Sequence, residues 1–438
     1  MQFNEAISIM KRYDKALFWL VVALGVLGFL TVLSVKPPYG WRQGAFFVCF
    51  LVLGVGLARI DYHVLERSAF LIYAGVVILL CGLFFFASPV RGSRSWYVLG
   101  NLYFQPVEIT KIAVIVVLAR LLSQNTKQGA LERGVPVGLM VIVAGIPCVL
   151  TLLQPDIGSA MTFILILIGM LLASWVDLRA LGTLVAFLIT SAVMTIFAIA
   201  QGQRGVPEWV AWLGRWFSGW PYILGPALVF AGLAGFVWIV AWRLGWHPKK
   251  RHFFWPVGVF SLALLVSVSV QYVLPPHLER RVFGFFLPEM DTLGSAYQII
   301  QSKIAVGSGG FIGKGIFGGS QSQLGFLPMA HTDFVFSVLG EELGFLGTAV
   351  VLALWWFVFM RCLRIIHESR DAFGSYLVFG ICWLFLAQVA MNIGMTLGIM
   401  PVVGLPLPFM SYGGSAMLGA MLGFAIIQSV YYHRYTYE

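Results

Sequence analysis

Long apolar runs alternate with short polar segments along almost the whole chain. A run of about 20 apolar residues has the length that an α-helix needs to cross the hydrocarbon core of a bilayer. The pattern therefore predicts an all-α polytopic membrane protein, built as a single membrane domain with about twelve transmembrane helices. The predicted spans are residues 16–35, 44–59, 69–87, 107–123, 136–153, 157–176, 178–200, 222–242, 253–274, 334–360, 374–398 and 415–432.

One long segment, residues 275–333, interrupts this pattern with charged residues and many glycines. A segment of this length without secondary structure is normally either functional or disordered, and disordered segments are rarely so rich in Phe, Ile and Leu. Within it, residues 297–304 alternate between apolar and polar positions with a helical period. We expect a large, ordered loop that forms a site.

The composition excludes an ordinary soluble protein, because 60% of the residues are hydrophobic and only 11% are charged, against about 25% charged in soluble domains. The net charge of +10 would suggest a nucleic-acid partner in a soluble protein. In a membrane protein the placement of the basic residues matters more than their total, and no nucleic-acid partner is expected. The five cysteines lie inside apolar runs and show neither zinc-site nor disulfide spacing. The first apolar run lacks a cleavage pattern, so we interpret it as a retained span and not as a signal peptide.

The basic residues indicate an orientation. Most of the 28 lysines and arginines fall in segments on the same side as the N-terminus, and an excess of basic residues marks the cytoplasmic side. An odd number of predicted spans precedes residues 275–333, so this loop is expected on the periplasmic or extracellular face. The basic residues on the N-terminal side are Lys11, Arg12, Lys15, Arg59, Arg67, Arg120, Lys127, Arg133, Arg179, Arg243, Lys249, Lys250, Arg251, Arg361, Arg364, Arg370 and Arg434.

Four tryptophans within residues 201–221 are spaced three and four apart, which places them on one face of a helix. They are Trp209, Trp212, Trp216 and Trp220. Tryptophan is enriched at membrane interfaces, so the spacing predicts a helix that lies on the outer membrane surface. A plain loop anchored by these indoles is the alternative.

Ionisable side chains inside spans are costly and are functional candidates by default. Glu108 and Lys111 are three residues apart at the start of one span, and Asp156 opens another. The structural alternatives are a salt bridge and a helix N-terminal carboxylate. Glu341 and Glu342, near the outer end of the span at 334–360, fit better as partners for loop arginines or backbone amides. Asn392 approaches the same outer face from the opposite direction.

In the loop, Asp291 lies in a turn-like context that exposes it. A single carboxylate near basic residues suits deprotonation of a hydroxyl while cations hold an anionic leaving group. A helix N-cap is the alternative role for Asp291.

The glycine-rich run at 307–315 fails the phosphate-loop pattern, because Ser308 stands where the first glycine is needed and Gly315 follows Lys314 in place of Ser or Thr. Its backbone amides remain a candidate phosphate cradle. His331 and Asp333 are too few ligands for a metal site.

A set of motifs in consistent order from residue 16 to 432 resembles the SEDS family (shape, elongation, division and sporulation). Residues 392–395 and 405–412 are more similar to elongation-type than to division-type members. The motifs are Gly92-Ser93-Arg94-Ser95-Trp96, Gln105-Pro106 with Glu108 and Lys111, Gln154-Pro155-Asp156-Ile157-Gly158, Asp291 with Gly294, Tyr297-Gln298, Gln301-Ser302, Gly307-Ser308-Gly309-Gly310, His331-Thr332-Asp333-Phe334, Gly340-Glu341-Glu342-Leu343-Gly344, Asn392-Ile393-Gly394 and Ser411-Tyr412-Gly413-Gly414-Ser415.

The resemblance implies a ten-span plan, to which residues 201–252 would add an interfacial helix and an extra hairpin. It implies a peptidoglycan glycosyltransferase that polymerises lipid II and depends on a divalent cation, Mg²⁺ or Mn²⁺. It also implies a class B penicillin-binding protein and other elongation-complex membrane proteins as partners.

On this basis we predict that Asp291 is the catalytic general base or holds the activating cation. Trp96 would stack on a sugar or line the lipid entry. A lipid II flippase or transporter, and an inactive scaffold for a penicillin-binding protein, are the rival functions. A transporter would place essential charges near the membrane midplane and show repeat symmetry. The predicted substrate-binding residues are Arg94, Trp96, Glu108, Lys111, Asp156, Gln298, Lys303 and Lys314.

Overall fold

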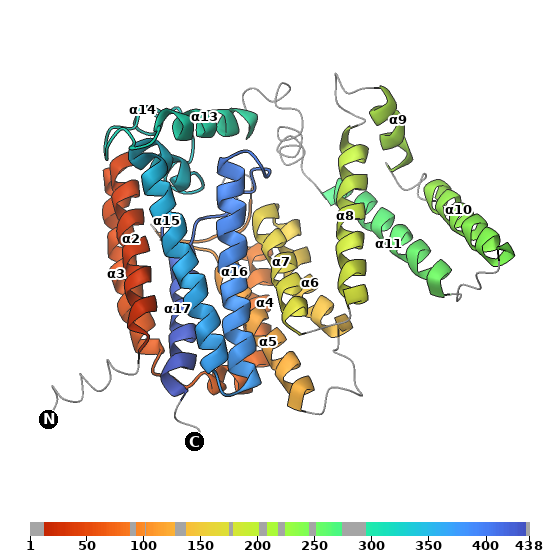
Figure 1. The fold of residues 1–438 in the computed structure, drawn as a ribbon, viewed down its shortest axis with the longest axis horizontal. Coiled ribbons are helices and arrows are strands. Elements are labelled where there is room, and N and C mark those ends of the chain that lie inside the picture. The colour runs from red at the N-terminus through yellow and green to blue at the C-terminus, as the bar shows by residue number, and fades with distance from the viewer. Residues whose placement is uncertain are drawn as a thin grey trace. The chain divides into compact units, whose positions relative to one another are not determined.

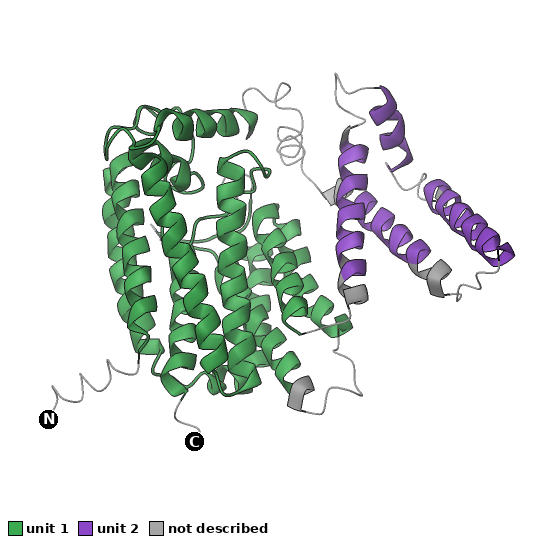
Figure 2. Ribbon diagram, in the orientation of Figure 1, with its two compact units in different colours: residues 1–174, 291–438 green, residues 175–290 purple. Residues whose placement is uncertain are grey.

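The computed structural model describes residues 13–87, 93–100, 102–127, 137–174, 178–200, 208–217, 224–244, 251–273 and 295–434. The chain divides into two compact units (Figure 2). Unit 1 combines residues 1–174 with 291–438, and unit 2 is residues 175–290.

Unit 1 is a bundle of long helices joined by short turns, with α13 lying across one end of the bundle (Figure 1). Its helices are α2 (Lys15–Val35), α3 (Pro37–Leu57), α4 (His63–Phe86), α5 (Val107–Lys127), α6 (Val137–Leu153), α7 (Ile157–Ala173), α13 (Ser295–Ser308), α14 (Ser320–Gln323), α15 (Val335–Glu368), α16 (Ala372–Thr396) and α17 (Gly414–His433).

A small antiparallel hairpin, β1 (Tyr97–Leu99) with β2 (Leu102–Phe104), interrupts the helical pattern between α4 and α5. The hairpin is a local feature that the sequence analysis did not predict, and the fold class remains helical. Gly100 provides the positive φ of +62° that the tight turn requires.

Unit 2 contains α8 (Leu178–Ala200), α9 (Glu208–Trp216), α10 (Leu224–Arg243) and α11 (Arg251–Val273). Helix α8 packs against α9 and α11. The helix predicted from the tryptophan spacing is present as α9, and its Trp209, Trp212 and Trp216 side chains are exposed. Trp220 lies outside the described residues, and the interfacial position of α9 stays a prediction.

Seven of the helices in the described part of the chain are long and apolar enough to cross a membrane. Several shorter apolar helices accompany them. The chain is therefore a helical polytopic membrane protein, and the count of twelve spans stays a prediction. The seven are Lys15–Val35, Pro37–Leu57, His63–Phe86, Gly225–Arg243, Val335–Glu368, Ala372–Thr396 and Gly414–His433.

Helix α5 is at the centre of unit 1 and contacts α4, α6, α7, α16 and α17. Every residue from Thr110 to Ala119 is buried. Neighbouring helices, and not lipid, therefore surround the Glu108 and Lys111 side chains. This explains how a helix that begins with Glu108 and Lys111 is tolerated inside a membrane domain.

Contacts between distant turns define two ends of unit 1. At the α13 end, the Ser302 hydroxyl donates to the carbonyl of Thr396 at 2.6 Å, and Gln105 donates to Asp156 at 3.0 Å. At the opposite end, which we call the terminal end, Arg361 donates to Asp14 at 2.5 Å. The helices therefore run alternately between the two ends, as the alternation of apolar runs predicts.

Helix α15 contains a break that the apolar pattern did not predict. Its 34 residues would extend about 51 Å at 1.5 Å per residue, far more than a bilayer core requires. Gly344 has φ +64° and ψ −161°, which separates a short helix from the longer one that follows. The span predicted at 334–360 is present within this helix, and the break near its start is a feature that the sequence analysis missed. A Cβ at this position would lie 2.4 Å from the backbone nitrogen of Gly313.

The glycine-rich run pairs with the chain on both sides of this break. The amides of Lys314 and Gly315 donate to the carbonyls of Glu341 and Glu342 at 3.1 and 2.8 Å. In return, two amides that follow Gly344 donate to carbonyls of the run at 2.9 and 3.1 Å. The amides of Lys314 and Gly315 are thus already engaged and are not a free phosphate cradle.

Candidate functional site

A buried ion pair lies in the first turns of α5. The Lys111 ammonium is 2.7 Å from a Glu108 carboxylate oxygen, and the two side chains are 1% and 7% exposed. The spacing of three residues places both side chains on one face of the helix, as the sequence predicted. Each charge neutralises the other, which lowers the cost of burying them.

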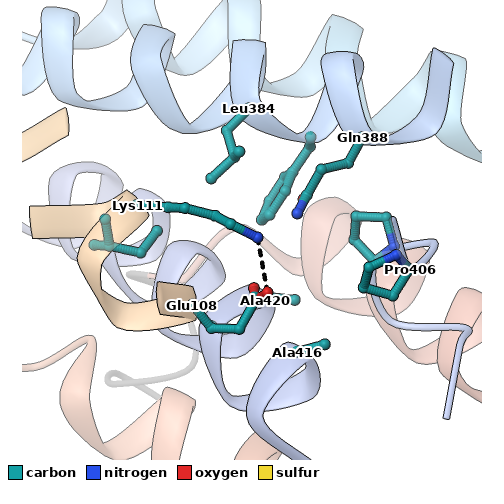
Figure 3. Close-up of a pocket in the computed structure, with 11 residues that line it drawn as sticks. Glu108, Lys111, Leu384, Gln388, Pro406, Ala416 and Ala420 are labelled. Carbon is teal, nitrogen blue, oxygen red and sulfur yellow. Dashed lines mark hydrogen bonds and ion pairs between the residues drawn. The ribbon is translucent and has the colours of Figure 1, made fainter. Parts of the chain in front are cut away.

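This ion pair forms one wall of a pocket enclosed by α5, α16, α17 and the segment at 406–408 (Figure 3). The pocket is narrow, with room for about one water molecule. Gln388 contributes a carboxamide, and the other walls are apolar. The lining residues are Glu108, Lys111, Ile112, Leu384, Phe385, Gln388, Pro406, Pro408, Ala416, Gly419 and Ala420.

Asp156 caps the N-terminus of α7. Its carboxylate accepts from the backbone nitrogen of Ser159 at 3.0 Å and from the Ser159 hydroxyl at 2.8 Å. It also accepts from the Gln105 carboxamide at 3.0 Å. The backbone nitrogen of Gln105 donates to the Ser415 hydroxyl at 2.9 Å. The capping interpretation of Asp156 is confirmed, and its hydrogen bonds link the start of α7 to the hairpin and to α17.

Arg94 and Trp96 lie just before the hairpin at the α13 end. The Ser93 hydroxyl anchors this segment by donating to the carbonyl of Gln154 at 2.6 Å. The Trp96 ring packs edge-on against Tyr103, with 6.4 Å between centroids. Arg94 is exposed and Trp96 is half-buried. Both are accessible to a ligand, and their predicted substrate contacts stay predictions.

Helix α13 confirms the helical period predicted within the loop. Its Lys303 side chain is exposed and lies against Gly398, while Gln298 is half-buried. Ser302 anchors the helix to Ser337 of α15, with 2.6 Å between the two hydroxyl oxygens. The structure thus holds Lys303 and Gln298 on an ordered helix at the α13 end, and their substrate contacts stay predictions.

Lys314 lies in an internal cluster. Its ammonium donates to the hydroxyls of Ser308 and Ser320 at 2.7 and 2.8 Å and to Glu341 at 2.9 Å. A lysine ammonium has three donors, so this cluster uses all of them. The geometry favours a structural role for Lys314, whose predicted contact with the substrate is untested.

Glu341 is the acceptor at the centre of this cluster and is fully buried. It also accepts from the backbone nitrogens of Gln321 and Ser322 at 2.8 and 3.0 Å. The interpretation of Glu341 as a partner for backbone amides is confirmed. Its cationic partner in the described part of the chain is a lysine and not the expected arginine. Glu342 accepts from the Ser34 hydroxyl, which connects the same segment to α2.

Asn392 ties two loops together at the α13 end, because its carboxamide donates to the carbonyls of Asp333 and Leu405 at 2.9 and 2.7 Å. The sequence interpretation missed Gln388, which precedes Asn392 by one helical turn on the same face of α16. A second polar residue inside an apolar span was the signal that could have identified it.

The predicted catalytic residue, Asp291, lies outside the described residues. Only residues 292–294 separate it from Ser295, the first residue of α13. Within the described ranges, no three His, Cys, Asp or Glu side chains come together as potential metal ligands. The predicted dependence on Mg²⁺ or Mn²⁺ stays a prediction.

The profile of the cell cycle protein family of FtsW, RodA and SpoVE matches residues 15–213 and 225–436. The chain belongs to this family, the SEDS family of peptidoglycan glycosyltransferases. The family assignment from the sequence motifs is confirmed.

Three SEDS relatives illustrate the similarity. The chain is 30% identical over 434 residues to the peptidoglycan glycosyltransferase RodA of Treponema pallidum, covering 95% of this chain and 97% of that one. It is 34% identical over 384 residues to MrdB of Escherichia coli K12, covering 88% and 83%. It is 31% identical over 434 residues to a probable FtsW of Trichlorobacter lovleyi, covering 96% and 93%.

Two solved structures share the fold. A chain of a peptidoglycan synthase complex superimposes with a TM-score of 0.65 at 28% identity, covering 97% of this chain and 98% of that one. The rod shape-determining protein RodA of Thermus thermophilus superimposes with a TM-score of 0.57 at 24% identity, covering the same shares. At that identity the second match supports the SEDS fold alone.

Proposed function

We propose that this chain polymerises lipid II into glycan strands at the outer face of the cytoplasmic membrane during cell elongation. The observation that carries the proposal is the pocket at the α13 end of a SEDS fold, where a buried ion pair and a carboxamide lie beside the hairpin that presents Arg94 and Trp96. Similar identities to RodA-type and FtsW-type relatives make a division-type polymerase the second candidate.

In the proposed reaction, the 4-hydroxyl of the acceptor sugar attacks the anomeric carbon of the donor, and the bond to undecaprenyl pyrophosphate breaks. Asp291 takes the hydroxyl proton as general base. The exposed cations Arg94 and Lys303 neutralise the charge that develops on the pyrophosphate. Lys111 is already paired with Glu108, so its part is to hold the pocket wall in place.

The proposed topology has twelve crossings, with a cytoplasmic N-terminus and the α13 end outside. Arginines at the terminal end, such as Arg361 and Arg370, support a cytoplasmic location for that end. We propose that residues 201–252 add α9 and a hairpin to a ten-span plan. An impermeant thiol reagent added to intact cells should label Lys303→Cys and not Arg370→Cys. The opposite pattern would place the site on the wrong side for lipid II.

A class B penicillin-binding protein is the proposed partner, together with other membrane proteins of the elongation complex. The support is the fold shared with a chain of a solved peptidoglycan synthase complex. Such a partner would crosslink the glycan strands that this chain makes.

The decisive experiment supplies lipid II to the purified chain in detergent, alone and with its class B partner. We expect glycan strands from the unaltered protein, and a rate lower by about 10²–10⁴ from Asp291→Asn, as for loss of a general base. Glu289→Gln is the matched control, because it changes a neighbouring carboxylate and should retain activity. Unfolding temperatures establish that the variants fold.

The same assay separates the rival functions. Detergent offers no second compartment, so a flippase or an inactive scaffold would form no glycan there. Absence of product from the unaltered protein with its partner would refute the polymerase proposal. Full activity of Asp291→Asn would remove only Asp291 from the mechanism.

A further inference from the structure

The segment 307–318, which contains the glycine-rich run, has an inverted distribution of side chains. Its only charged residue, Lys314, is paired with the buried Glu341. Its large apolar side chains, in contrast, are 42% to 76% exposed. A loop in water normally shows the opposite arrangement, and an exposed apolar patch marks a contact with protein or membrane. The exposed apolar residues of the segment are Phe311, Ile312, Ile316 and Phe317.

Two contacts between α2 and α15 indicate the depth of this segment. Arg361 of α15 binds Asp14, the residue that caps α2. Glu342 of α15 accepts from Ser34 in the last turn of α2. The 21 residues of α2 extend about 31 Å at 1.5 Å per residue, close to the thickness of about 30 Å of a hydrocarbon core. Glu342 therefore lies at the edge of the core on the side of the α13 end.

Part of the segment lies on the membrane side of that edge. The apolar stretch Phe345–Met360 of α15 extends only about 24 Å, which is shorter than the hydrocarbon core by about 6 Å. Residues near the break at Gly344 must supply the difference. The Phe311 ring stacks on the Phe345 ring, with 5.8 Å between centroids and 20° between planes. The contact places Phe311 at the depth of the first apolar turn after the break.

The backbone of the segment has internal partners, which a non-helical segment at this depth requires. The amides of Lys314 and Gly315 donate to carbonyls of α15, and two amides that follow Gly344 donate back to the segment. Within the segment, the Gly313 amide donates to the carbonyl of Gly309 at 2.9 Å. These backbone groups therefore do not depend on water.

The glycines bring the segment directly onto α15. A Cβ at Gly309 would lie 1.9 Å from the carbonyl oxygen of Gly340, and a Cβ at Gly313 would lie 2.2 Å from that of Glu342. Only glycine permits so close an approach, and small residues are typical of closely packed surfaces in membrane proteins. The motif that fails the phosphate-loop pattern is thus explained as a packing surface, whose apolar neighbours in sequence point away from the protein.

We propose that the segment 307–318 is embedded in the membrane leaflet at the α13 end, with Phe311 and Ile312 in contact with lipid acyl chains. This leaflet is the outer one in the proposed topology. The exposed apolar face of α15, which includes Phe345 and Val350, continues the patch. Lipid therefore adjoins the patch directly. The proposal does not depend on the polymerase function, and it places in the membrane a part of the loop that the sequence predicted outside it.

Photocrosslinking in cells that produce the full chain tests what covers the patch. The photoreactive residue benzoylphenylalanine replaces Ile312, and mass spectrometry of the irradiated, purified protein identifies the adducts. We expect adducts with phospholipid acyl chains. The same residue in place of Phe357, which is exposed on α15, is the positive control. In place of Lys303, which is exposed on α13, it should give no phospholipid adduct.

Thiol labelling provides an independent measurement. In membrane fragments that are open on both faces, a water-soluble maleimide should label Lys303→Cys at least about 10-fold faster than Ile312→Cys, because a thiol in an apolar environment is not ionised. Phe311→Cys is a second variant with the same expected protection. The five native cysteines lie in apolar runs, and the unaltered protein measures their background. Unfolding in detergent should abolish the difference.

Equal labelling rates at positions 303 and 312 would overturn the proposal, because the segment would then face water. A main adduct with another protein or with a second copy of this chain would also overturn it, as would the absence of a phospholipid adduct at position 312 when position 357 gives one. None of these results bears on the polymerase function, which is tested separately with lipid II in detergent.

Discussion

Each end of unit 1 contains an aspartate that caps a helix, but the two aspartates differ in their additional partners and in their exposure. At the terminal end, Asp14 caps α2 through the backbone nitrogen of Leu17 at 2.9 Å and also binds Arg361 and Gln428. At the α13 end, Asp156 caps α7, but its additional partner is the neutral Gln105. Asp14 is 1% exposed, whereas Asp156 is only half-buried.

Within the described residues, the capping aspartate of the terminal end is therefore paired with a cation, and that of the α13 end is not. A second carboxylate of the terminal end is also engaged internally, because Asp371 accepts from the Tyr62 hydroxyl and from the backbone nitrogen of Gly374. At the α13 end, Gln388 faces a pocket and Arg94 and Lys303 are exposed. The proposed substrate site lies at this end. Substitutions at the two ends should therefore separate stability from activity.

The largest effect is expected from Lys111→Met, which leaves the buried Glu108 carboxylate without its cation. Removing one partner of a buried ion pair costs about 3–5 kcal/mol. Denaturant titration in detergent measures the loss. The double variant with Glu108→Gln should recover most of the stability and remain a poor polymerase, because the pocket wall has lost its charges. A single variant as stable as the unaltered protein would contradict the burial of the pair.

A smaller loss is expected from Arg361→Met at the terminal end. The change removes the charged hydrogen bond to Asp14, and a buried group left unsatisfied costs about 1–3 kcal/mol. Because the proposed substrate site lies at the other end, polymerisation per folded molecule should stay unchanged. Activity normalised to the folded fraction provides the measurement. A large fall in normalised activity would refute the division of roles between the two ends.

The sequence predicted the site best where the signal is local. The spacing of three residues between Glu108 and Lys111 fixes a shared helix face. The Asp156-Ile157-Gly158-Ser159 order places a carboxylate before an apolar run, which indicates an N-cap. The helical period at 297–304 identified α13. The starts of helices were predicted less well. The apolar pattern placed the start of the second span at residue 44, whereas α3 begins at Pro37. Proline suits the first turn of a helix, but the polar residues that follow it hid this start.

Contacts between distant segments gave no such signal. Lys314 and Glu341 are 27 residues apart, and neither residue indicates that the other is its partner. The break at Gly344 lies in an apolar run in which every residue is compatible with a helix, and its cause is the glycine-rich run packed against it. The pocket that Gln388 lines is formed together with α5, α17 and the segment at 406–408, so only the folded chain reveals it.

Lys314 and Lys303 provide the next comparison, within the α13 end itself. Lys314→Met should lower stability by about 1–2 kcal/mol, because it removes three hydrogen bonds from a side chain that is 29% exposed. Lys303→Met should change stability by less than about 0.5 kcal/mol, as for an exposed site, and should raise the KM for lipid II. Unfolding and steady-state kinetics distinguish the two. A raised KM with unchanged stability in Lys314→Met would restore Lys314 to the substrate site.

A modest effect is expected at Asp156, where a cap and a substrate contact are both consistent with the geometry. Asp156→Ala removes the cap and should cost about 1 kcal/mol, whereas Asp156→Ser retains a capping oxygen and should recover most of that loss. If Asp156 acts only as a cap, the serine variant polymerises lipid II at nearly the parental rate. If the carboxylate also contacts substrate, the serine variant is stable and slow. Thermal unfolding and initial rates on the same preparations separate these outcomes. A serine variant as unstable as the alanine variant would contradict the capping role. It would show that the hydrogen bond to Gln105 stabilises this end instead.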